Sequence, residues 1–214
     1  MIDIGVKNIM GVYYLSKESE KVEGVAWYKN AYNSCKAIAR KYKCYKITLR
    51  EVVGVCSALS PNNKWHKNII DTEHMVLAYK SGIPLEEVKV ATYHPNKQKA
   101  KDMLDYGKIP KKVIRDILFG KSGHKTRAFF DCIYGCKTNK DTVCVDGHAL
   151  HIYMGEKHAL SSSKSNMTPK QYLTISQAYI DACDEINKRE GTSYLPYQIQ
   201  AITWVAWRRM HGIT

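Results

Sequence analysis

Residues 48–60 read Thr48-Leu49-Arg50-Glu51-Val52-Val53-Gly54-Val55-Cys56-Ser57-Ala58-Leu59-Ser60, and this stretch decides how the chain folds. Its valine-rich middle is compatible with a strand. However, Thr48 followed three residues later by Glu51 is a capping box, which satisfies backbone donors at the start of a helix. Pro61 then ends the run, as prolines commonly end helices. The stretch therefore predicts a buried helix, and the segments on either side of it support the same class of fold.

The remaining periodic segments also predict helices. Apolar residues recur at helical spacing, Pro110 and Pro169 stand where first-turn prolines are favoured, and Ser81-Gly82 marks a helix end. Residues 161–166 are polar and predict a loop, and no pair of alternating strands is found. We expect an all-α protein of about eight to ten short helices, forming a single domain over residues 1–214. Besides 48–60, the expected helices cover 22–42, 64–80, 96–106, 110–119, 123–134, 146–154, 168–189 and 197–210.

The charge balance indicates a polyanionic partner. The 214 residues include 33 Lys and Arg against 20 Asp and Glu, a formal net charge of +13. Such a field concentrates polyanions, and each phosphate contact releases counterions. DNA is therefore the expected partner, although an acidic protein or an anionic small molecule could use the same field.

Cysteine usage and hydropathy predict an intracellular protein. Seven cysteines are scattered without a Cys-x-x-Cys pair, so the pattern favours neither a disulfide framework nor a zinc finger. The N-terminus lacks a signal-peptide pattern, and no run approaches the ~18 apolar residues of a membrane span. We expect a soluble cytoplasmic monomer of a bacterial or phage-infected cell, without membrane association, metal or cofactor.

The segment Gly120-Lys121-Ser122-Gly123 predicts a phosphate-binding turn between two helices. Glycines tolerate positive φ and let a phosphate approach the backbone, and the following helix start offers unpaired N–H groups. Lys125 then lies in the first turn of that helix. The positive dipole end and neighbouring cations disfavour its protonated form, and a neutral amine is the better nucleophile. A plain glycine-capped turn with a solvated lysine fits the same pattern.

Asp146 follows the apolar run Val143-Cys144-Val145 and precedes an apolar helical run, which predicts a helix N-cap. A capping carboxylate is held in place by the backbone. Cleavage of an N-glycosidic bond builds positive charge on the sugar, and a fixed carboxylate nearby stabilises that charge. Asp146 is therefore a candidate for a chemical role as well as a structural one.

These segments together resemble the helix-hairpin-helix DNA glycosylase superfamily, of the endonuclease III type. Gly120 to Ala128 is similar to the hairpin and catalytic lysine of that superfamily, and Val145-Asp146-Gly147-His148 to its Val-Asp-x-His signature. The run from Ala58 to Lys64 resembles its Leu-Ser-x-Gln segment. The resemblance covers residues 48–155 and implies two helical lobes with a cleft between them.

The resemblance also implies roles for individual residues. Lys125 would be the amine that forms a Schiff base, and Asp146 its carboxylate partner. Asn62 or Asn63 would be the wedge that fills the gap left by the flipped base, which is unreachable inside the stack. Further DNA contacts would come from Lys64, Gly120, Lys121, Ser122, Gly123 and His148.

This chain departs from the family at three points. Its hairpin has two residues, Lys121 and Ser122, between the glycines instead of one, and Phe119 replaces the usual proline before the first glycine. The interval from Lys125 to Asp146 is a few residues longer than in well-known members. No cysteine follows Cys183, so the iron–sulfur cluster of the family is not expected.

The C-terminal segment and two histidines provide further candidates. Gln200, Trp204 and Arg208 recur at i, i+4 and i+8, so Gln200 and Trp204 could line a base pocket by hydrogen bonding and stacking, or simply cover the surface. Trp65, flanked by lysines, could also stack on a base or be an inward anchor. His148 and His151 share a helix face, but no third metal ligand is evident, and His148 is expected to orient the site or to lie in the core.

Three functions remain open from the sequence. The first is a DNA glycosylase, with or without lyase activity, that excises a flipped base. The second keeps this fold but modifies DNA bases, as relatives of these glycosylases are thought to do in phage. The third is a DNA-binding module without catalysis.

Overall fold

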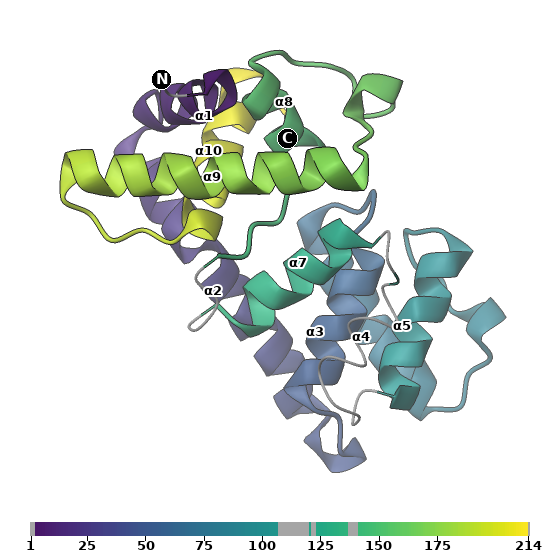
Figure 1. Cartoon of the computed structure of the whole chain (residues 1–214). Helices are drawn as coiled ribbons and strands as arrows, with labels where there is room; N and C mark the ends of the chain where they lie inside the picture. The colour runs from purple at the N-terminus through teal and green to yellow at the C-terminus, as the bar shows by residue number, and fades with distance from the viewer. Residues whose placement is uncertain (1–2, 107–119, 121–122, 137–140, 214) are drawn as a thin grey trace. The chain divides into compact units, whose positions relative to one another are not determined.

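A computed structural model of the chain describes residues 3–106, 120, 123–136 and 141–213. Within these ranges all regular secondary structure is helical and no strand is present (Figure 1). The protein is therefore all-α, as the sequence predicts. The expected helix at 110–119, and with it the first half of the predicted hairpin, lies outside the described residues.

The chain divides into two compact units. Unit 1 consists of Met1–Tyr28 and Lys137–Thr214, and unit 2 consists of Lys29–Cys136. One long helix, α2 (Glu18–Lys41), contributes its first half to unit 1 and its second half to unit 2. Each unit is described by itself below.

Unit 2 is built around α3 (Leu49–Leu59), the helix predicted from the capping box. Thr48 accepts a hydrogen bond from the Glu51 backbone N–H, and the Glu51 carboxylate accepts one from the Thr48 N–H at 2.7 Å. Every residue from Glu51 to Leu59 is buried, which explains the valine-rich composition that also suits a strand. The helices α4 (Trp65–Lys80), α5 (His94–Tyr106) and α7 (His124–Tyr134) pack against α3, and two 3₁₀ turns, η1 (Lys43–Tyr45) and η2 (Leu85–Glu87), complete the unit.

Unit 1 packs α1 (Ile4–Tyr14) against α8 (Gly147–Met154), α9 (Pro169–Glu190) and α10 (Pro196–Met210), with a 3₁₀ turn η3 (Ser163–Ser165) before α9. Gly24 of α2 lies where a Cβ would stand 2.5 Å from the Ile202 backbone, so only glycine allows this approach of α2 to α10. Buried Tyr13 donates a hydrogen bond to Glu190 at 2.6 Å. Burial, together with that bond, raises the pKa of Tyr13 above its ordinary value.

Helix α1 is the one described α-helix that was not predicted from the sequence. Asp3 caps it by accepting hydrogen bonds from the backbone N–H groups of Gly5 and Val6, and its buried residues contact three other helices. The segment contains two glycines, Gly5 and Gly11, and glycine lowers the intrinsic helix propensity of a sequence. Tertiary packing therefore stabilises a helix that local preference leaves undecided.

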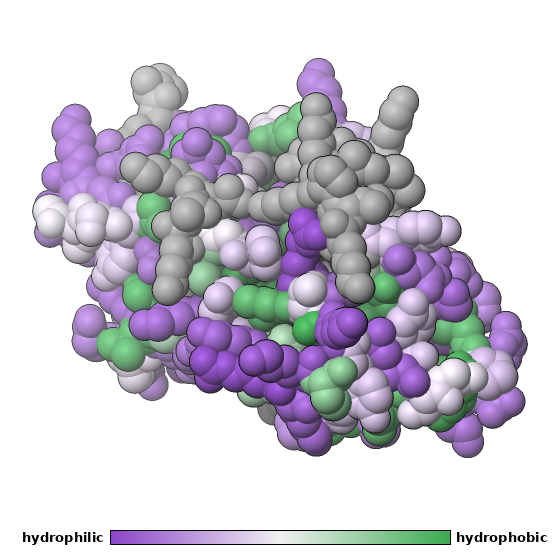
Figure 2. All heavy atoms as spheres, turned by 90° about the horizontal axis from the view of Figure 1, so that it is seen from below, coloured by the Kyte–Doolittle hydropathy of each residue, from purple (hydrophilic) through white to green (hydrophobic). Residues whose placement is uncertain are grey.

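Formal charge is distributed unequally between the two units. Counted on the sequence, unit 2 carries 21 Lys and Arg and 9 Asp and Glu, a net charge of +12. Unit 1 carries 12 and 11, a net charge of +1. The face of the molecule in Figure 2 is largely hydrophilic, with hydrophobic side chains scattered among polar ones. None of the described helices is long and apolar enough to cross a membrane.

Candidate functional site

Asp146 is the N-cap of α8, as predicted. One carboxylate oxygen accepts a hydrogen bond from the Ala149 N–H at 2.8 Å. The segment that precedes Asp146 is also fixed, because the Tyr172 hydroxyl of α9 donates to the Val143 carbonyl at 2.9 Å and accepts from the Val145 N–H at 3.2 Å. The position of the carboxylate is therefore set by the backbone on both sides of it.

The second oxygen of Asp146 accepts a hydrogen bond from the indole N–H of Trp204 in α10 at 3.2 Å. Two residues that the sequence singles out for separate reasons, 58 positions apart, are thus direct partners in unit 1. Both residues are partly exposed.

Other rings and one cation surround Trp204. The ring centroids of Trp27 and His148 lie 6.1 and 6.4 Å from that of Trp204, both in edge-on geometry. The guanidinium of Arg208 stands 4.4 Å from the Trp204 ring centroid, a cation–π contact. We call Asp146, Trp204, Trp27, His148 and Arg208 the Asp146 cluster.

Gln200 lies one helical turn before Trp204 but faces inward. It is 5% exposed, and its side-chain oxygen accepts a hydrogen bond from the Tyr28 hydroxyl at 2.9 Å. The Tyr28 ring packs edge-on against Tyr197 at 5.4 Å between centroids. Gln200 is therefore part of the buried interior of unit 1.

The histidines of α8 have different environments. His151 is buried and its Nε2 lies 2.9 Å from the Ser165 hydroxyl. Burial lowers the pKa of His151, and the neighbouring His148 and His158 lower it further, so the neutral imidazole is favoured at neutral pH. Among the residues that the structure describes, no group of three or more His, Cys, Asp or Glu side chains could hold a metal ion.

Lys125 is the second residue of α7 in unit 2, after the Gly123 N-cap and His124, and is partly exposed. Gly120 has a φ of +60°, the left-handed conformation that a glycine turn allows. The neighbouring His124 and Arg127 side chains contact each other at 3.0 Å, and burial together with Arg127 lowers the pKa of His124. Lys121 and Ser122, the other hairpin candidates, lie outside the described residues.

Asn62 and Asn63 form the corner between α3 and α4, and their side chains have different environments. Asn62 is exposed and has a φ of +56°. The Asn63 amide donates to Asp71 at 3.0 Å, a carboxylate that is fully buried and also accepts from the Ala91 N–H at 2.9 Å and from Lys67 at 2.7 Å. Asn63 is therefore held back by the fold, and Asn62 is the asparagine that projects.

The two other candidates at this corner take ordinary helix-start positions. Lys64 is the exposed N-cap of α4 without a side-chain capping bond, and Trp65 is the first residue of that helix and partly exposed. Trp65 belongs to unit 2, whereas Gln200 and Trp204 belong to unit 1. The structure thus places the candidates in three groups: the Asp146 cluster, the Asn62–Asn63 corner and the start of α7.

Three residues of these groups were not predicted as site residues. Arg208 was noted only as the third member of the Gln200 stripe, although its i+4 spacing from Trp204 indicates the contact that forms. Trp27 lies on a helix whose partner could not be inferred from the sequence. For Asp71, the i,i+4 spacing from Lys67 predicts an ion pair but gives no sign that the carboxylate is buried.

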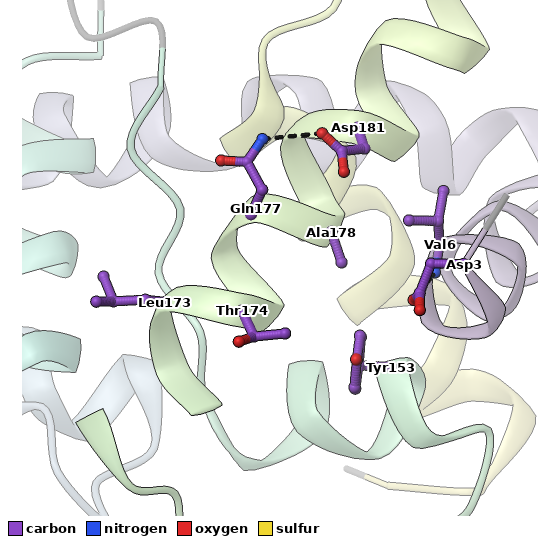
Figure 3. A pocket seen from close by; sticks show the side chains of 8 residues that line it. All are labelled: Asp3, Val6, Tyr153, Leu173, Thr174, Gln177, Ala178 and Asp181. Atoms are coloured by element: carbon purple, nitrogen blue, oxygen red, sulfur yellow. Dashed lines mark hydrogen bonds between the residues drawn. The ribbon is translucent and has the colours of Figure 1, made fainter. Parts of the chain in front are cut away.

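An open hollow of about 410 Å³ lies in unit 1 between α1, α8 and α9 (Figure 3). Its rim carries Asp3, Asp181 and Gln177, and the Gln177 amide donates to Asp181 at 2.8 Å. None of the predicted site residues lines this hollow.

A family model described as a family of unknown function, DUF7178, matches residues 3–211. No curated protein and no solved structure matches the chain. The function must therefore be inferred from the geometry above and from the resemblance of the motifs.

Proposed function

The chain belongs to the DUF7178 family, described as a family of unknown function, and we propose that it is a DNA glycosylase that flips a base and cleaves its N-glycosidic bond. The observation that carries the proposal is the Asp146 carboxylate. Asp146 is partly exposed, and both of its oxygens accept hydrogen bonds from neutral donors, the Ala149 N–H and the Trp204 indole.

A carboxylate held in this way suits the chemistry of glycosidic cleavage. As the bond to the base lengthens, positive charge develops on the sugar, and a negative group that is already positioned stabilises it without reorganisation. Neutral hydrogen-bond donors fix Asp146 while leaving its negative charge uncompensated. Among the described residues, no Lys, Arg or His forms an ion pair with Asp146.

The Trp204 ring, one face of which is occupied by Arg208, gives the same site an aromatic element. Aromatic rings stack on bases of any sequence, and a base outside the duplex needs such a partner. In the proposal Asp146 stabilises the charge that develops on the sugar, and the Trp204 ring stacks on the flipped base. Asn62 is the wedge, because Asn63 is tied to Asp71.

Lys125 is proposed as the amine in a glycosylase with lyase activity. Its Nζ attacks C1′ of the sugar, the bond between C1′ and the base nitrogen breaks, and the base leaves with the electron pair and takes up the proton that the Nζ loses. The C1′–O4′ bond then breaks, O4′ takes the second Nζ proton, and a Schiff base remains between Lys125 and C1′. Borohydride reduces that C=N bond and traps the enzyme on the DNA.

The test uses the trapping reaction. Duplexes that each carry one damaged or modified base are incubated with the protein and borohydride. A covalent adduct that Lys125→Ala abolishes, and that Lys89→Ala retains, supports the proposal. Lys89 is a suitable control because it is an exposed lysine of the same unit outside every candidate site.

Each other outcome has a defined meaning. Release of free base without an adduct would remove Lys125 from the chemistry but keep a glycosylase centred on Asp146. Intact DNA with a base of altered mass would replace the proposal with a base-modifying enzyme. A shift in electrophoretic mobility without any change in the DNA, on every substrate, would replace it with a binding module.

A further inference from the structure

The second half of α2 carries a stripe of side chains that the proposed function leaves unused. Lys29, Asn33, Lys36 and Arg40 follow one another at i, i+4, i+7 and i+11, a spacing that places them along one face of a helix. The stripe spans about 16 Å at 1.5 Å per residue. Three of the four side chains are exposed, and Lys36 is partly exposed with its ammonium 5.8 Å from the Tyr32 ring centroid.

The opposite face of this half-helix is the one that unit 2 buries. Ala31, Cys35 and Ile38 are buried there, together with Tyr42 just beyond the helix end. Packing therefore fixes the rotation of the helix about its axis, and that rotation turns the stripe toward solvent.

The basic region continues past the end of α2. Lys43 and Lys46 are exposed in and after η1, and Arg50 stands in the first turn of α3. Between positions 29 and 50 the sequence contains seven Lys and Arg and no Asp or Glu. We call Lys29, Lys36, Arg40, Lys43 and Lys46 the α2 basic surface.

Complementation of the helix dipole does not explain this surface. Cations are favoured in the last turn of a helix, which accounts for Arg40 and Lys41. Lys29 lies three turns earlier, Lys43 and Lys46 lie beyond the helix, and a cation at the start of α3 is disfavoured by the dipole of that helix.

Internal ion pairing does not explain it either. Lys41 pairs with Glu73, which lowers the pKa of that carboxyl group, and Lys41 is for this reason left out of the surface. Within the described part of the chain, none of the five members of the α2 basic surface has a carboxylate partner. Five like charges without compensation raise the energy of the folded state unless an anion binds them.

We infer that the α2 basic surface binds the phosphate backbone of DNA, through residues other than those of the Asn62–Asn63 corner and the start of α7. The inference rests on the proposed function in that it takes DNA as the partner. Exposed lysines and arginines aligned over this length suit successive phosphates, and Asn33 can donate to a phosphate oxygen. Because such contacts read no bases, the surface would hold DNA of any sequence while the site searches for its target base.

The test is the salt dependence of binding to an undamaged duplex, followed by fluorescence anisotropy between about 50 and 200 mM salt. Each phosphate contact contributes about 0.9 to the slope of log K against log salt. Replacement of Lys29, Lys36, Arg40 and Lys43 by Gln is expected to reduce that slope by about 2 to 4, and to weaken binding at least tenfold at the lowest salt. Glutamine has nearly the helix propensity of lysine and arginine, so the fold is retained, which a thermal melt verifies.

The matched control makes the same change of charge in unit 1. Lys7, Lys17, Lys170 and Lys188 are exposed there, and their replacement by Gln is expected to leave the slope within about 0.5 of the wild-type value. Equal losses in both variants would mean that only net charge matters, and the inference would be wrong. An unchanged slope in the α2 variant would also overturn it.

Two further measurements keep the α2 basic surface distinct from the proposed reaction and from membrane binding. Borohydride trapping with the wild-type protein tests the proposed function. If the wild type is trapped on DNA but the α2 variant has an unaltered slope, the proposed function stands and the inference about the surface is wrong. If the α2 variant has a reduced slope but the wild type is not trapped, the surface stands and the proposed lyase reaction is wrong. Sedimentation with vesicles that contain phosphatidylserine tests a membrane. If the α2 variant loses vesicle binding but not DNA binding, the surface belongs to a membrane and the inference fails.

Discussion

The two units use nearly equal lengths of chain, yet one carries a net charge of +12 and the other +1. Unit 2 contains the wedge candidate, the start of α7 and the α2 basic surface. Unit 1 contains the Asp146 cluster, whose carboxylate is held by neutral donors. A lysine-rich surrounding would pair with such a carboxylate and cancel its charge, so the near-neutrality of unit 1 suits the role that we propose for Asp146.

The largest effect is expected for Asp146→Asn, which tests whether the uncompensated carboxylate of unit 1 is needed for base excision. Asparagine also caps helices, and its Oδ1 can accept the bond from the Ala149 N–H, but its Nδ2 is a donor and cannot accept the bond from the Trp204 indole. The substitution therefore removes the negative charge and one of the two hydrogen bonds. We expect base excision to slow by about 10² to 10³-fold, the cost of losing one electrostatic group, while DNA affinity is retained because the proposed backbone contacts lie in unit 2. Single-turnover rates and anisotropy measure the two effects.

Asp141→Asn is the control for that variant, because Asp141 is exposed and five residues before Asp146. An Asp146→Asn protein that excises bases at the wild-type rate would show that the carboxylate only caps α8.

Gly24→Ala tests whether unit 1 can be weakened alone. The new Cβ would stand 2.5 Å from the backbone of Ile202, which cannot move aside as a side-chain tip can. We expect unit 1 to lose about 1–3 kcal/mol of stability, as overpacking in a core does. Hydrogen exchange should then accelerate in α1 and α10, while α3 of unit 2 keeps its protection.

Gly11→Ala is the matched variant, since a Cβ at that position of α1 meets nothing within 4 Å. It should be neutral or stabilising by up to about 1 kcal/mol through helix propensity. Equal destabilisation by both substitutions would contradict the steric account of Gly24.

The Asn62–Asn63 corner sharpens the comparison within unit 2. Asn63→Ala deprives the buried Asp71 of a donor and should cost about 1–2 kcal/mol of stability. Asn62→Gly keeps the left-handed backbone and removes the projecting side chain, so stability should be unchanged while excision falls on the order of tenfold through poorer base flipping. Urea unfolding and excision rates distinguish the two, and the reverse pattern would make Asn63 the wedge.

The smallest expected effect is a pH dependence of unit 1. The pKa of His151 in the folded state is lowered from 6.5, so its contribution to stability is complete above pH 6.5 and is lost as the pH falls through the folded-state pKa. In the His151→Gln variant this position cannot take up a proton. The variant should therefore lose less stability than the wild type between about pH 7.5 and 5.5. His66→Gln, at an exposed histidine of unit 2, should leave that loss as it is in the wild type.

The local signals of the sequence predicted much of this structure. The capping box at Thr48, the N-cap at Asp146 and the proline at position 169 each mark a helix start that the structure contains. Such signals act within one turn of the chain, and for that reason a single sequence reveals them.

The arrangement of the site depended on contacts that no local pattern contains. The bond from Trp204 to Asp146 and the ring of Trp27 beside it join segments far apart in the chain. Likewise, Asn62 and Asn63 are equivalent in the sequence, and only the burial of Asp71, eight residues after Asn63, separates a projecting side chain from a restrained one. Helix α1 was missed because its stability comes from its neighbours.

The Tyr172 hydroxyl makes two hydrogen bonds to the backbone of a neighbouring segment, as an adjacent strand does in a sheet. By donating to the Val143 carbonyl and accepting from the Val145 N–H, a single oxygen atom takes the place of a neighbouring strand for the extended segment that leads to Asp146. Tyr172→Phe removes only this hydroxyl and therefore both hydrogen bonds to the segment. The Asp146 carboxylate, the Trp204 indole and the charge of the protein are unchanged. Position 172 thus offers a means of adjusting how rigidly Asp146 is held without altering its chemistry.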